Sequence, residues 1–146
     1  MDNRDILVDT SIIIDFLRKK NKQHTMLWKI KERDFNCFIS SITVFELYAG
    51  AITPRHKKDL EKILKWLEIV SLTREIAEQS AEIYKRLKRE NKLIEFRDIF
   101  IGATCIVLNI PLITFNEEHF KRIEGIKTYN KDIWPVAAVD SLPARR

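Results

Sequence analysis

Cysteine, glycine and proline are scarce in this chain of 146 residues, which contains 2, 3 and 4 of them respectively. Two cysteines cannot staple a small secreted scaffold, and so few glycines and prolines allow few tight turns. These shortages argue against a disulfide-rich protein, an all-β sandwich, a collagen and a low-complexity chain. Cys37 and Cys105 both lie in apolar runs, so we expect buried and reduced thiols.

Long hydrophobic runs are missing as well. The longest apolar stretch covers residues 99–108, which is too short for a membrane-spanning helix of roughly 20 residues. The first residues are mostly charged or polar and do not form the apolar region of a signal peptide. We therefore expect a soluble, cytoplasmic protein that has no membrane partner.

The apolar content is nevertheless sufficient for one packed domain. Hydrophobic residues make up 45% of the chain and charged residues 32%. We expect a single domain over residues 1–135, followed by a disordered tail over residues 136–146. The formal net charge of +5 is compatible with a nucleic-acid partner, and equally with a basic protein that binds none.

Short apolar runs alternate with amphipathic segments along the chain. Strands are predicted at 6–8, 35–40, 69–72, 112–114 and 126–129, and helices at 11–20, 24–33, 43–51, 55–68, 73–90, 98–108 and, as a single turn, 117–122. This alternation is typical of an α/β protein in which a parallel sheet carries helices on both faces. Ligands of such folds bind beyond the carboxyl ends of the strands, so the residues that follow each strand are the candidates for a site.

Two acidic residues stand at such positions or near them. Asp9 directly follows the strand predicted at 6–8, where it is a candidate for the sheet edge or simply a helix N-cap. Glu46 lies on the helix predicted at 43–51 and points away from its apolar face, among small neighbours. That face either looks into a cleft or is merely solvated.

Asp98 begins the apolar run that we expect to be a buried helix. A carboxylate near a helix N-terminus is favoured by the helix dipole, but a buried one also needs a cation or hydrogen-bond donors. Arg97 is adjacent and is a candidate for that cation, although consecutive residues on a helix do not face each other. Asn116 follows the strand predicted at 112–114 and is either a further site residue or a turn residue.

These four residues can converge at one edge of a parallel sheet. Several carboxylates within a few ångströms repel one another unless a cation lies between them. Oxygen ligands suit Mg²⁺ or Mn²⁺ rather than Zn²⁺, and the three histidines have no zinc-ligand spacing. The sequence has no glycine-rich phosphate loop, nucleophile elbow or Cys-x-x-Cys motif.

Four segments resemble the motifs of the PIN-domain family, in order and at the usual spacing. They are ILVDTSIIIDFL at 6–17, SSITVFELYAG at 40–50, RDIFIGATC at 97–105 and LITFNEEHFKRI at 112–123. The resemblance runs from about residue 6 to residue 130 and is greatest to VapC-type toxins of prokaryotic toxin–antitoxin pairs. It implies a three-layer α/β/α fold with a short, mostly parallel sheet of four to five strands.

The resemblance also implies a Mg²⁺-dependent endoribonuclease, with Mn²⁺ as a substitute metal. Asp9, Glu46 and Asp98 match the three acidic positions of the family, and Asp9 and Asp98 match its direct metal ligands. Asn116 stands where many members carry a fourth aspartate, which leaves the number of metals open. Ser11 matches a hydroxyl position near the metal, and Asp15 a common helix position that we regard as structural.

The partners that the resemblance implies are an RNA substrate, a cognate antitoxin protein that occupies the active site, and a second copy of the chain in a homodimer. Ile52, Trp66 and Ile69 are candidate dimer contacts, but packing in the core explains them equally well. Basic residues at 18–20, at 55–58, and at 85–86 with 88–89 are candidate phosphate contacts or ordinary solvated helix faces.

The expected reaction is hydrolysis of RNA phosphodiesters by metal-activated water, with Glu46 positioning or deprotonating that water. The products would be a 5′-phosphate and a free 3′-hydroxyl. Two alternatives keep the same fold: an RNA-maturation nuclease, and a catalytically inactive RNA-binding module. A phosphatase or receiver-type domain is disfavoured because Ser11 stands two residues after Asp9, where such sites use a second aspartate.

Overall fold

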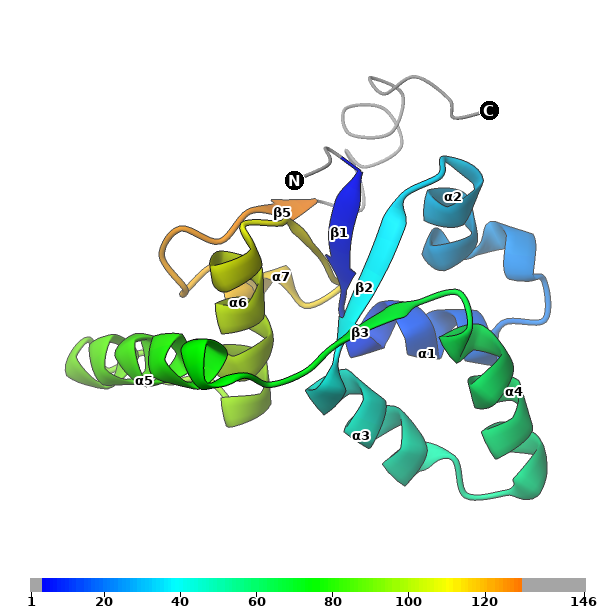
Figure 1. The fold of residues 1–146 in the computed structure, drawn as a ribbon, viewed down its shortest axis with the longest axis horizontal. Coiled ribbons are helices and arrows are strands. Elements are labelled where there is room, and N and C mark those ends of the chain that lie inside the picture. The colour runs from blue at the N-terminus through cyan, green and yellow to red at the C-terminus, as the bar shows by residue number, and fades with distance from the viewer. Residues whose placement is uncertain (1–3, 130–146) are drawn as a thin grey trace.

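The computed structural model describes residues 4–129, which form a five-stranded parallel sheet with helices on both faces (Figure 1). The strands are β1 (Asp5–Val8), β2 (Asn36–Ser40), β3 (Glu68–Val70), β4 (Leu112–Ile113) and β5 (Thr128–Tyr129), in the order β3-β2-β1-β4-β5. The sheet confirms the expected three-layer α/β/α class. The domain boundary predicted at residue 135 and the tail predicted at 136–146 lie outside the described residues.

The helices connect successive strands, as the predicted alternation requires. They are α1 (Thr10–Arg18), α2 (Met26–Glu32), α3 (Ser41–Gly50), α4 (Pro54–Leu64), α5 (Arg74–Arg89), α6 (Phe96–Leu108) and α7 (Glu117–Phe120), with a 3₁₀ turn, η1 (Lys22–His24), before α2. The helix predicted over 55–68 is too long, because α4 ends at Leu64 and Glu68 already belongs to β3.

Two hydrophobic cores lie on opposite faces of the sheet. Alternate side chains of β1 enter different cores, since successive residues of a strand point to opposite faces. Ile6 and Val8 pack among residues of α1, α2 and α4, whereas Leu7 packs among residues of α5 and α6. All three are fully buried, which explains why the central strand reads as an uninterrupted apolar run.

Short polar side chains fix where several helices begin. Ser40 accepts a hydrogen bond from the backbone N–H of Ile42, and Thr73 accepts one from that of Ile76. Thr53 caps α4 in the same way, directly before Pro54. The helix α6 ends at Leu108, because the next residue, Asn109, has a left-handed φ of 54° that stops the helix.

Both cysteines are buried and free, as their apolar surroundings predict. Burial raises the pKa of the Cys37 thiol to about 12, although the charge of Lys31 opposes this rise. Burial also raises the pKa of Cys105, and the charge of Asp9 acts in the same direction. Neither thiol therefore ionises near neutral pH. Among residues 4–129, no helix has the length and apolar character that crossing a bilayer requires.

Gly102 lies at a close contact between α6 and the segment that follows α7. A Cβ atom at this position would overlap Cδ1 of Ile123, which is itself buried. We expect Gly102→Ala to destabilise the protein by about 1–3 kcal/mol, despite the better helix propensity of alanine. Urea denaturation measures this free energy of unfolding.

Ile123→Val is the matched background, because it deletes the atom that the new methyl group would meet. In that background Gly102→Ala should be neutral or stabilising. An equal loss in both backgrounds would show that the overlap with Ile123 is not the cause.

Candidate functional site

Three carboxylates from different elements meet at the carboxyl edge of the sheet. Asp9 directly follows β1, Glu46 lies on α3, and Asp98 lies in the first turn of α6. All three contact the guanidinium of Arg97. Its Nε lies 2.5 Å from Glu46 Oε2, its Nη2 lies 3.3 Å from Asp9 Oδ1, and its Nη1 pairs with Asp98 Oδ1. We call Asp9, Glu46 and Asp98 the carboxylate cluster.

Asp9 occupies the N-cap position of α1 but makes no side-chain capping hydrogen bond. Its fully buried carboxylate instead turns toward the cluster. Oδ2 accepts hydrogen bonds from Ser11 Oγ at 3.0 Å and from Thr114 Oγ1 at 2.7 Å, and Oδ1 faces Arg97. The side chain of Asp9 therefore does not cap α1. Three donors, from Ser11, Thr114 and Arg97, compensate its buried negative charge.

Glu46 is only partly buried and lies at the open side of the cluster, with 25% of its side chain exposed. Its Oε1 accepts a hydrogen bond of 2.8 Å from Thr10 Oγ1, and Thr10 also lies 3.1 Å from the hydroxyl of Thr43. Glu46 itself thus borders a site, whereas its small neighbours Ala49 and Gly50 are exposed. Glu46 is the cluster member that water reaches most easily.

Asp98 is 1% exposed, and this burial raises the pKa of its carboxyl. The neighbouring charge of Asp9 raises the pKa further, whereas Arg97 and His119 oppose the rise. His119 Nδ1 lies 3.3 Å from Asp98 Oδ2. Burial by itself would lower the pKa of Arg97, but the hydrogen bond with Glu46 and the charges of the cluster raise it overall. Arg97 therefore stays a cation.

The Asn116 side chain makes no hydrogen bond with the carboxylate cluster. Asn116 is exposed and stands immediately before α7, where its side chain makes no capping hydrogen bond. Its backbone N–H donates to Thr114 Oγ1 at 2.9 Å, so it reaches Asp9 only through that threonine. A catalytic role for Asn116 stays a prediction, as do the roles predicted for Asp9, Glu46 and Asp98.

Sequence reasoning missed several residues around the cluster. Arg97 was a candidate cation for Asp98, and the structure confirms that pair, but its contacts with Asp9 and Glu46 were not foreseen. His119 was considered only as a zinc ligand, yet it lies beside Asp98. The hydroxyls of Thr10 and Thr114 carried one usable signal, since Thr114 ends the strand predicted at 112–114 and Thr10 lies two residues after the strand predicted at 6–8.

The donor set suits a hard cation, because the buried groups that converge on Arg97 are all oxygens. The guanidinium of Arg97 lies among these oxygens. Within residues 4–129, no group of three or more His, Cys, Asp and Glu side chains is arranged to bind one metal ion. Arg97 thus supplies the positive charge that the carboxylates require. A divalent cation would fit the same oxygens only after the guanidinium moves away.

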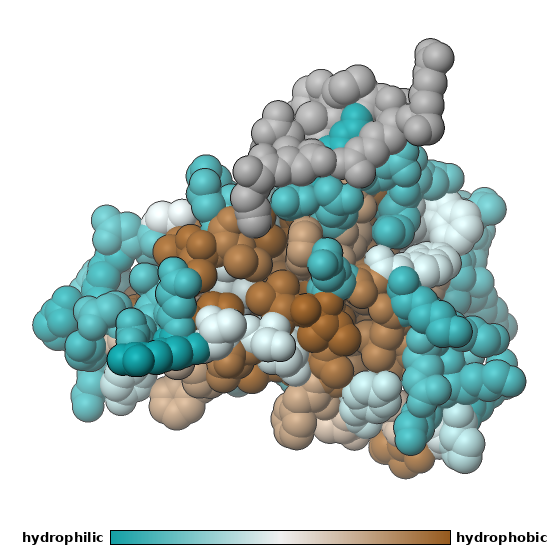
Figure 2. Space-filling view, viewed as in Figure 1, coloured by the Kyte–Doolittle hydropathy of each residue, from teal (hydrophilic) through white to brown (hydrophobic). Residues whose placement is uncertain are grey.

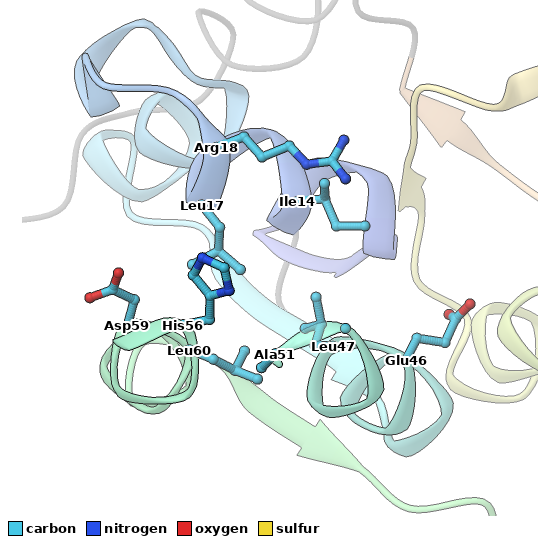
Figure 3. Close-up of a pocket in the computed structure, with 10 residues that line it drawn as sticks. Ile14, Leu17, Arg18, Glu46, Leu47, Ala51, His56, Asp59 and Leu60 are labelled. Atoms are coloured by element: carbon cyan, nitrogen blue, oxygen red, sulfur yellow. The ribbon is translucent and has the colours of Figure 1, made fainter. Parts of the chain in front are cut away.

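A cavity of about 440 Å³ opens next to the cluster, between α1, α3 and α4 (Figure 3). Glu46 lies at one end of its lining, and His56 and Asp59 lie at the other. Ile14, Leu17, Leu47 and Leu60 make much of the wall apolar. The carboxylate cluster therefore borders, through Glu46, a hollow that can hold a ligand.

Comparisons with known proteins match most of this chain. The family profile of the PIN domain matches residues 6–126. Ribonuclease VapC1 of Methanocaldococcus jannaschii is 34% identical over 128 residues, which cover 86% of this chain and 88% of that protein. Ribonuclease VapC of Rickettsia bellii is 30% identical over 129 residues, which cover 84% of this chain and 92% of that protein.

Solved structures share the fold. A structure of VapBC2 from Rickettsia felis, bound to a DNA fragment from its promoter, aligns with a TM-score of 0.78 and 23% identity, over 86% of this chain and 98% of that chain. DNA-bound VapBC from Salmonella typhimurium aligns with a TM-score of 0.75 and 27% identity, over 86% of this chain and 96% of that chain.

The raised pKa of Asp98 predicts that this residue costs folding free energy at neutral pH. A carboxyl whose pKa is higher in the folded protein contributes stability below its unfolded pKa and loses it as the pH rises through the folded value. Asp98→Asn should therefore raise the melting temperature at pH 7 in metal-free buffer, and the gain should shrink toward pH 4. Calorimetry of the wild type and of Asp98→Asn between pH 4 and pH 7 measures the gain in melting temperature and its dependence on pH. A gain that does not change with pH would exclude the ionisation of Asp98 as its cause.

Removing Arg97 should leave the carboxylates without their cation. We expect Arg97→Ala to cost about 3–5 kcal/mol in metal-free buffer at pH 7, because two of its three acidic partners are buried. Denaturant titration measures this loss. Arg74→Ala is the matched control, since Arg74 pairs with Glu78 on an exposed helix face, and its change should stay within about 0.5 kcal/mol. Equal losses in the two variants would contradict a special role for Arg97.

Proposed function

The chain belongs to the PIN-domain family and, within it, to the proteins called ribonuclease VapC, and on that premise we propose that it is a metal-dependent endoribonuclease, the toxin of a toxin–antitoxin pair. The relatives named as ribonucleases support RNA as the substrate, and the solved VapBC structures support an antitoxin as the partner. The observation that carries the proposal is the convergence of Asp9, Glu46 and Asp98 on one cation.

Asp9 and Asp98 would hold the metal, for which we propose Mg²⁺ with Mn²⁺ as a substitute. Both are buried, both point at the same positive charge, and carboxylate oxygens are the ligands that these ions prefer. When bound, such an ion supplies positive charge to a phosphate group and makes a water molecule easier to deprotonate. The exposed position of Asn116 supports no second set of ligands.

The protein's own residues would then orient the reactants. Glu46, at the open side of the cluster, can accept a proton from the attacking water. Thr10 fixes one of its oxygens by a hydrogen bond of 2.8 Å. Ser11 and Thr114 hold the carboxylate of Asp9 in place, so that it does not turn back to cap α1. We expect a 5′-phosphate and a 3′-hydroxyl as the products.

We infer that a second copy of the chain covers exposed apolar side chains near β3 and α3. Figure 2 shows hydrophobic surface in the middle of one face, between the hydrophilic surfaces over α5 and α4. Ile52 is 86% exposed and Ile69 48%, so core packing does not explain them. Trp66 differs, because its ring packs edge-to-face against Phe16 and Trp28.

Cleavage of a labelled RNA tests the proposed activity. We expect Mg²⁺-dependent cleavage by the wild type, its loss in EDTA and its return with Mn²⁺. Asp98→Asn should reduce the cleavage rate at least a hundredfold while the protein stays folded, because a ligand and a charge are lost together. End-group analysis of the fragments checks for 5′-phosphates.

Asp15→Asn is the matched control, since Asp15 is also largely buried, pairs with Lys19 on α1 and lies outside the cluster. Its rate should stay within about twofold of the wild type. RNA binding without cleavage by the wild type would instead identify an inactive RNA-binding module. Undiminished cleavage by Asp98→Asn would contradict the proposed metal site.

A further inference from the structure

The two buried aspartates of the carboxylate cluster use their oxygens in the same way. In Asp9, Oδ1 faces the guanidinium of Arg97, and Oδ2 accepts hydrogen bonds from two hydroxyl groups. In Asp98, Oδ1 pairs with the same guanidinium, and Oδ2 lies 3.3 Å from Nδ1 of His119. Each carboxylate thus turns one oxygen toward the cation, while side chains of other elements hold its second oxygen.

The contact between His119 and Asp98 determines which ring nitrogen carries a proton. An ionised carboxylate only accepts hydrogen bonds, so Nδ1 of His119 is the donor. At 3.3 Å this hydrogen bond is slightly longer than the usual N–H···O bond. We therefore expect it to orient Asp98 with a moderate effect, smaller than that of a short bond.

The fold holds His119 at this place through its neighbour in the sequence. Phe120 is fully buried in the core that α5 and α6 form, which fixes the short helix α7 against α6. The backbone N–H of His119 donates to the carbonyl oxygen of Asn116 at 3.3 Å. The His119 side chain is 54% exposed and that of Asp98 only 2%, so the ring meets the buried carboxylate at the protein surface.

His119 and Glu46 reach the cluster from opposite sides. The strands β2 and β4 flank β1, and Glu46 lies on the helix after β2 whereas His119 lies on the helix after β4. The ring can therefore hold Asp98 without covering the open side of the cluster, where Glu46 meets water.

We propose that His119 is a positioning residue for Asp98, which holds Oδ2 so that Oδ1 keeps its direction when a divalent ion replaces Arg97. This inference rests on the proposed function and adds a residue to its metal site. When Arg97 moves away, Oδ1 of Asp98 loses its partner, and the hydrogen bond from His119 still restricts rotation of the carboxylate. A ligand that is already oriented loses less freedom on binding, so the ion binds more tightly.

Two substitutions separate the Nδ1 hydrogen bond from the rest of the ring. The amide nitrogen of asparagine is bonded to Cγ, as Nδ1 of histidine is, whereas that of glutamine lies one bond further out. We expect His119→Asn to bind Mn²⁺ within about threefold of the wild type and His119→Gln to bind it about tenfold more weakly. Electron paramagnetic resonance of free Mn²⁺ measures this affinity without RNA, at one fixed pH.

Glu118→Ala is the matched control on the same helix, because Glu118 is exposed and pairs with Lys121. Its affinity for Mn²⁺ should equal that of the wild type. Urea denaturation should give all three variants the midpoint of the wild type, since neither side chain is part of the core. In RNA cleavage, His119→Gln should need about tenfold more Mn²⁺ for half of its maximal rate, with an unchanged KM for RNA.

Equal Mn²⁺ affinity in the wild type and in both His119 variants would overturn the proposal. Equal weakening by His119→Asn and His119→Gln would also overturn it, because the ring would then act otherwise than through Nδ1. A raised KM for RNA with unchanged Mn²⁺ affinity would assign His119 to the substrate instead. In each of these cases, metal-dependent cleavage by the wild type would leave the proposed function standing. A wild type that neither binds Mn²⁺ nor cleaves RNA would contradict both.

Discussion

Three like charges that surround one guanidinium constrain the rest of this structure. Asp9 and Asp98 are almost completely buried, and buried carboxylates are tolerated only where cations or donors compensate them. The compensation comes from residues far apart in the chain, since Arg97 and Thr114 reach Asp9 from α6 and from the end of β4. The central position of β1 between β2 and β4 brings these groups to one place.

Much of the fold follows from local pattern. The run at 6–8 predicts a buried strand because both of its faces are covered, and the amphipathic segments predict helices that cover them. The residues at which helices and strands end are harder to predict from local pattern. The apolar spacing of α4 continues beyond Leu64, but the chain must turn there so that Glu68 can pair with Phe38 of β2. That requirement comes from the sheet and not from the segment itself.

The candidate site divides in the same way. The three carboxylates were identifiable from their positions in the sequence. Asp9 follows a strand, Glu46 lies on a helix face with small side chains, and Asp98 begins an apolar helix. The reach of Arg97 across three elements depends on distances that no spacing rule contains. Asn116 follows a strand as Asp9 does, yet β4 is only two residues long and the chain leaves the sheet before the Asn116 side chain meets the cluster.

The position of Arg97 also affects how tightly any divalent ion can be held. An ion attracted to these oxygens must first displace a guanidinium that already contacts all three carboxylates. Its net affinity is therefore the intrinsic affinity reduced by the free energy of that exchange. If the proposed ion binds here, this exchange sets a threshold concentration of free ion, below which Arg97 remains paired with the carboxylates.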